Sequence, residues 1–65
     1  MDYEMVTLKM KLASIEATKQ ELLKEADRMK KAKRFTYSDR VGLSDVLAEL
    51  NDEADSIKQA LRGVL

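Results

Sequence analysis

Two rows of apolar residues at helical spacing constrain the fold of this 65-residue chain more than any other feature. In the first half, apolar residues recur at alternating steps of three and four, which is the spacing of a heptad seam along one face of a helix. Lys19 interrupts this row where its next member would stand. No Gly or Pro occurs between about residues 2 and 33, so we predict one long helix there. The first seam consists of Met5, Leu8, Leu12, Ile15, Leu22, Ala26 and Met29.

The second row keeps the same alternation without interruption and predicts a second helix from about residue 44 to 62. Ser44 stands where an N-cap residue is expected, and Gly63 where a C-terminal cap is expected. The second seam consists of Leu43, Leu47, Leu50, Ala54, Ile57, Leu61 and Val64.

The segment between the rows, residues 34–42, changes to aromatic and β-branched residues in alternation with polar ones. This pattern favours a small β-hairpin, in which Phe35 and Tyr37 share one face of a strand and residues 38–40 form the turn. The alternative is an irregular loop between helices. The predicted fold is therefore mainly α (α+β): two antiparallel amphipathic helices joined by a short β-hairpin, in one domain over residues 1–65.

Charge is divided into blocks along the chain. Five acids and no base lie between Asp45 and Asp55, and in an antiparallel hairpin this acidic block would lie beside a basic cluster near the connection. The cluster also suggests nucleic acid as a ligand, but its acidic neighbour and the zero net charge favour a structural role. The basic cluster consists of Arg28, Lys30, Lys31, Lys33, Arg34 and Arg40.

The composition argues against catalysis and against a membrane span. The chain has no His, no Cys and no glycine-rich loop, so we expect no enzyme activity, no metal site and no cofactor. No apolar run approaches the ~20 residues that span a bilayer, and the acidic start is unlike a signal peptide. The absence of Cys fits a reducing, cytoplasmic setting.

A second apolar stripe lies on the first half of the first helix and points about 180° away from the seam. One partner helix cannot cover both faces, so we predict that this stripe contacts another protein chain, together with Phe35 and Tyr37. The alternative is ordinary exposed surface, with alanines present for helix propensity. We call this set the outer stripe: Tyr3, Val6, Met10, Ala13 and Ala17.

The order of elements resembles a known family of small phage proteins. A long helix, the strand-like Lys33-Arg34-Phe35-Thr36-Tyr37, the turn Ser38-Asp39-Arg40 and the helix opening Leu43-Ser44-Asp45 are similar to the gpW-like head-completion proteins of tailed phages. The resemblance implies a subunit of the head-to-tail connector, located in the neck of the virion, that oligomerises on the portal and closes the head. It implies no catalytic residues.

The sequence thus predicts a structural, non-enzymatic assembly protein with protein partners, either further copies of itself or a portal-like chain. An alternative is a cytoplasmic coiled-coil adaptor or chaperone-like regulator that binds one partner helix. A third hypothesis is a helical hairpin that binds nucleic acid.

Overall fold

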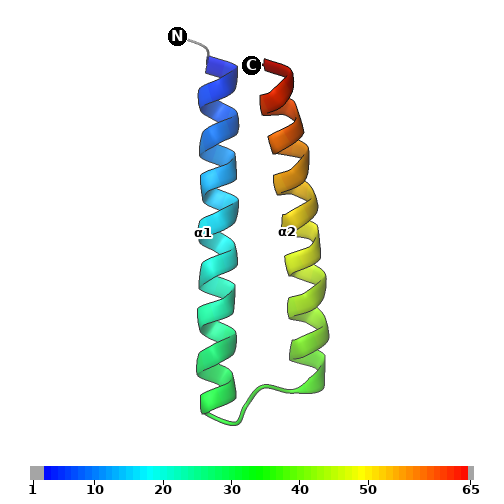
Figure 1. Ribbon diagram of the computed structural model, residues 1–65. Helices are drawn as coiled ribbons and strands as arrows, with labels where there is room; N and C mark the ends of the chain where they lie inside the picture. Colours follow the sequence, from blue (N-terminus) through cyan, green and yellow to red (C-terminus); the bar gives the residue numbers. More distant parts are fainter. Residues whose placement is uncertain (1–2, 65) are drawn as a thin grey trace.

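The computed structural model describes residues 3–64, which form two long helices and a short connection (Figure 1). Helix α1 spans Tyr3–Lys31 and helix α2 spans Tyr37–Val64. The two helices run antiparallel along their whole length, as the sequence predicts. The predicted start of the first helix at Asp2 lies outside the described residues.

Both predicted seams face the junction between α1 and α2. Every described seam side chain is buried or half-buried, and Ala54 is the most enclosed at 2% exposure. Ile15 and Ala26 are the other buried members. The side chain of Val64 is not among those that the structure describes, so its place in the seam stays a prediction.

Lys19 occupies the seam position that the sequence leaves without an apolar residue. Its side chain is only 22% exposed, and its ammonium lies 3.7 Å from the carboxylate of Glu16. A long aliphatic stem can lie along apolar surface while its charged end reaches water, which explains how a lysine fits this position.

Helix α1 ends in a Schellman motif, two residues before the predicted end of about 33. The amide of Arg34 donates to the carbonyl of Met29 at 2.8 Å, and the amide of Lys33 donates to that of Lys30 at 3.1 Å. Lys33 adopts the left-handed conformation that this motif requires, with φ of 59°. The backbone therefore turns sharply here without a glycine.

The predicted β-hairpin over residues 34–42 is wrong, because residues 3–64 contain no strand and α2 already begins at Tyr37. Thr36 is the N-cap. Its hydroxyl accepts from the amide of Asp39 at 3.1 Å, while its own amide and hydroxyl donate to the Asp39 carboxylate at 3.0 and 2.9 Å. This reciprocal capping box gives hydrogen-bond acceptors to the backbone N–H groups of Thr36 and Asp39, and it thereby favours the start of a helix over a strand.

Three further sequence predictions are also wrong. Ser44 lies inside α2 and is not its N-cap, and Gly63 is helical without the left-handed conformation of a C-cap. Phe35 and Tyr37 do not share a face of a strand, because Phe35 is half-buried beside the connection and Tyr37 is 80% exposed.

The hairpin is long and flat, and it exposes more surface than a compact protein of its mass. Its Cα atoms extend over 48 × 17 × 11 Å, and their radius of gyration is 15.1 Å, against about 11 Å for a compact chain of this length. Its accessible surface is 5206 Å², against roughly 4200 Å² for a compact monomer of 7.4 kDa. Two helices in one layer leave two broad faces open.

Candidate protein-interaction surfaces

The outer stripe is exposed on the side of α1 that is turned away from α2. Tyr3 is 78% and Met10 67% exposed, and Val6, Ala13 and Ala17 are also exposed. The predicted position of this stripe is therefore correct. Its role as an interface stays a prediction.

The basic cluster gathers at the connected end of the hairpin. Within it, Lys30 places its ammonium 5.0 Å from the centre of the Phe35 ring, which is cation–π distance. Phe35 thus contacts this lysine and is not a free stacking platform. Tyr37 and Arg40 line a shallow hollow beside the pair.

Ion pairs do not join the acidic block to the basic cluster within residues 3–64. Within residues 3–64, every pair closer than 4.0 Å lies inside α1, at spacings of three or four residues. Arg28 pairs with Glu25 at 3.4 Å and Lys31 with Asp27 at 3.1 Å. A residue one helical turn away is a closer partner than an acid across the junction.

One broad face, which we call the groove face, carries two open grooves along the junction of the helices. The groove toward the free ends is floored by Leu8, Ile15 and Ile57, and the groove toward the connection by Leu22, Ala26 and Leu43. Most charged groups on their rims are acidic. The charged rim residues are Lys11, Glu25, Asp39, Asp52 and Glu53.

The groove face also holds residues that sequence reasoning missed. Val46 and Gly42 line the groove near the connection, and Val46 is exposed. Nothing lies within 4 Å of the position where a Cβ on Gly42 would stand, so no contact within the chain explains this glycine. The signal was available in the spacing, because Val46 and Glu53 directly flank the second seam on one side.

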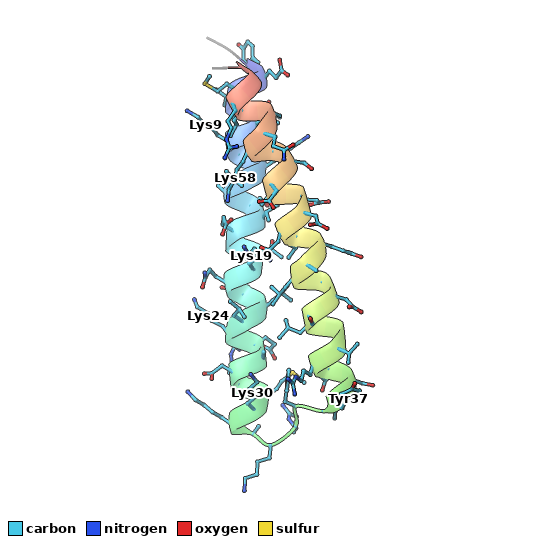
Figure 2. The ribbon with its side chains drawn as sticks, turned by 45° about the vertical axis from the view of Figure 1, so that its right-hand side comes forward. Lys9, Lys19, Lys24, Lys30, Tyr37 and Lys58 are labelled. Atoms are coloured by element: carbon cyan, nitrogen blue, oxygen red, sulfur yellow. The ribbon has the colours of Figure 1, made fainter. Side chains whose placement is uncertain are left out.

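The opposite broad face, which we call the lysine face, is basic. Lys9 and Lys30 flank the first seam, and Lys58 flanks the second, on the side opposite the grooves. Figure 2 shows Lys9 and Lys58 toward the free ends, Lys19 midway along the hairpin, and Lys30 and Tyr37 beside the connection. Arg40 adds a further charge near Lys30, and Glu16 is the acid that flanks the first seam here.

The pKa of Asp39 is shifted below its ordinary value near 3.8. The causes are the hydrogen bonds that its carboxylate accepts from the amide and then from the hydroxyl of Thr36. Both stabilise the charged form. The capping box at the start of α2 therefore accounts for the lowered pKa of Asp39.

No protein family model, curated protein or solved structure matches this chain. Within the described part of the chain, no helix is long and apolar enough to cross a membrane. The same residues hold no group of three or more side chains suited to a metal ion. The surfaces that the described residues present are the outer stripe, the groove face and the lysine face.

Proposed function

We propose that this chain is a structural, non-enzymatic assembly protein, which works by packing its helical hairpin against other protein chains. The observation that carries the proposal is the incomplete burial of the seams. Residues such as Leu12, Leu50 and Ile57 are oriented toward a core, yet two helices in a single layer leave them half-buried. Further helices on the broad faces would remove this apolar surface from water.

The excess of accessible surface indicates how large a protein–protein contact the hairpin could form. The hairpin exposes about 1000 Å² more than a compact monomer of its mass, which is close to the area that one partner buries in a standard protein–protein interface. A small helical chain commonly gains stability by oligomerisation for the same reason.

The more specific connector role implied by the phage resemblance is not part of this proposal. Most of the argument for that resemblance came from the predicted β-hairpin, and residues 34–42 instead form a loop and the first turns of α2, so the connector role stays a prediction. The general part of the role, assembly through helix packing, stands on the surfaces described above.

The test is the mass of the purified chain by size-exclusion chromatography with light scattering, beside circular dichroism at matched concentration. We expect a helical species heavier than the 7.4 kDa monomer. Comparison of Met10→Lys with Gln20→Lys then shows whether the outer stripe takes part. Both variants add one charge to an exposed position of α1, but Met10 belongs to the stripe and Gln20 lies beyond it.

The outcomes separate the hypotheses. A helical monomer that finds no protein partner would contradict the proposal. A one-to-one complex with a different chain would favour an adaptor. DNA retention that falls steeply with salt would favour the nucleic-acid hypothesis, which would act through Lys33, Arg34 and Arg40 at the connection.

A further inference from the structure

The two broad faces of the hairpin are each large enough for a specific interface. The Cα atoms extend over 48 × 17 Å across such a face, which is about 800 Å² in projection. A standard protein–protein interface buries about 800 Å² of accessible surface on each partner. Both faces border the same half-buried seams. Covering only one of them would leave the other side of the junction open to water.

The two faces differ in the sign of their charge. Among the described residues that line the two grooves, four are carboxylates and one, Lys11, is a cation. Among the described residues that occupy the seams or directly flank them on the lysine face, five are cations and one, Glu16, is a carboxylate. The cations of the lysine face are Lys9, Lys19, Lys30, Arg40 and Lys58.

We propose that a second copy of this chain covers each broad face, with the lysine face of one copy packed on the groove face of the next. This inference rests on the proposed function and names the partner. Contact between two groove faces would oppose carboxylates to carboxylates, and contact between two lysine faces would oppose ammonium groups. Like charges that meet in an interface repel each other, whereas unlike faces attract and set the pairing.

Exposed apolar side chains occur on both surfaces that would meet. Val46 stands on the rim of a groove, and Leu23 flanks the first seam between Glu16 and Lys30 on the lysine face. Gly42 lets a neighbouring chain approach the backbone of α2 closely. The outer stripe stays outside this contact and is left for a different chain.

A contact between unlike faces is heterologous, so each copy keeps one unoccupied face after the first contact. Such contacts continue into a closed ring or an open filament and do not stop at a dimer. This property makes the proposal testable with two variants that each block one face.

The lysine-face variant carries Lys9→Glu and Lys58→Glu, and the groove-face variant carries Glu25→Lys and Glu53→Lys. All four sites are exposed, and glutamate and lysine have similar helix propensity, so both variants should remain folded. The control carries Gln20→Glu and Lys24→Glu, which lower the charge by nearly as much on the outer surface of α1. Assembly is measured by sedimentation velocity near physiological salt, because salt screens attraction between charges that are not in direct contact.

We expect the parent and the control to form species whose mass grows with concentration. Each face variant alone should sediment as a 7.4 kDa monomer with a helical circular dichroism spectrum. In an equimolar mixture of the two variants, assembly should return, because the reversed charges on the two altered faces complement each other as the intact faces do.

Other outcomes would overturn the proposal. If one variant is monomeric while the other assembles like the parent, two identical faces meet. If both variants assemble like the parent and Met10→Lys does not, the outer stripe is the interface, and the proposed function survives without this inference. A parent that stays monomeric at every concentration refutes self-assembly altogether.

Discussion

The N-cap of α2 offers a sharp comparison, because the sequence pattern and the structure assign it to different residues. Thr36→Ala removes the hydroxyl that accepts from the Asp39 amide and that donates to the Asp39 carboxylate. Loss of an N-cap side chain costs about 1–2 kcal/mol. In a domain this small, each kcal/mol moves the melting temperature by roughly 4–8 °C, so we expect a drop of about 5–15 °C.

The matched control is Ser44→Ala, at the position that the sequence predicts as the cap. Ser44 is exposed inside α2, where alanine is the better helix former, so this variant should match the parent or gain a few tenths of a kcal/mol. Thr36→Ser, which keeps the hydroxyl, should restore most of the loss. Thermal unfolding by circular dichroism at matched concentration measures all three, and a larger loss in Ser44→Ala than in Thr36→Ala would refute the capping box.

Substitutions and acid can also test the end of α1, the seam between the helices and the capping carboxylate. Lys33→Gly should stabilise the chain by about 1 kcal/mol because glycine adopts the left-handed conformation without a Cβ penalty, whereas Lys33→Ala should bring no such gain; urea unfolding compares them. Leu50→Ala should cost about 2 kcal/mol, near the lower end for core truncation because Leu50 is half-buried, while the exposed control Val41→Ala should cost much less in the same titration. The Asp39 carboxylate stabilises the fold fully above the pKa of the unfolded chain, and this contribution is lost as pH falls through the lower pKa of the folded state. Acidification from pH 5 to pH 2 should therefore destabilise the parent more than Asp39→Asn, and equal losses in acid melting curves would contradict that role.

The helices and their facing surfaces were predictable because a heptad seam is a long, repeated signal. Each seam contains seven members, so a single exception such as Lys19 does not disturb the pattern. Burial follows from the same spacing. The outer stripe was placed correctly by the same reasoning, because its direction depends only on the helical repeat.

The connection was mispredicted because its signals are short and conflict with one another. Phe35, Thr36 and Val41 have high β propensity, but tertiary context and capping outweigh propensity in so short a segment. The pattern Thr36-x-x-Asp39 is a capping box, while Ser44 has Leu47 at the corresponding position. Reading the third residue after each candidate cap would have placed the start of α2 correctly.

The end of α1 and the ion pairs were hidden for different reasons. A left-handed cap is usually marked by glycine, and here Lys33 adopts it, so composition gave no signal. The charge blocks predicted only that acids and bases lie side by side. The ion pairs themselves form within α1, because acids three or four residues before Lys19, Lys24, Arg28 and Lys31 lie on the same face of the helix. Three of those pairs are exposed and contribute little to stability, and only the pair of Lys19 with Glu16 is partly buried.

The two broad faces could not be identified from either seam alone, because each face is formed by residues of both helices. The sequence gives one row of flanking residues for each helix, such as Lys9 and Lys30 on α1 and Lys58 on α2. Whether those rows lie on the same side depends on the antiparallel arrangement and its register. The opposite charges of the two faces are therefore a property of the assembled hairpin.

The measurement that most directly tests whether this hairpin functions by association is the dependence of its melting temperature on its own concentration. If the half-buried seams are covered by further copies, mass action stabilises the folded chain, and the melting temperature should rise steadily over a hundredfold range of concentration. Circular dichroism at 222 nm in cells of different path length records this directly. A melting temperature that stays constant, in a chain that sediments at 7.4 kDa throughout the range, would contradict self-assembly.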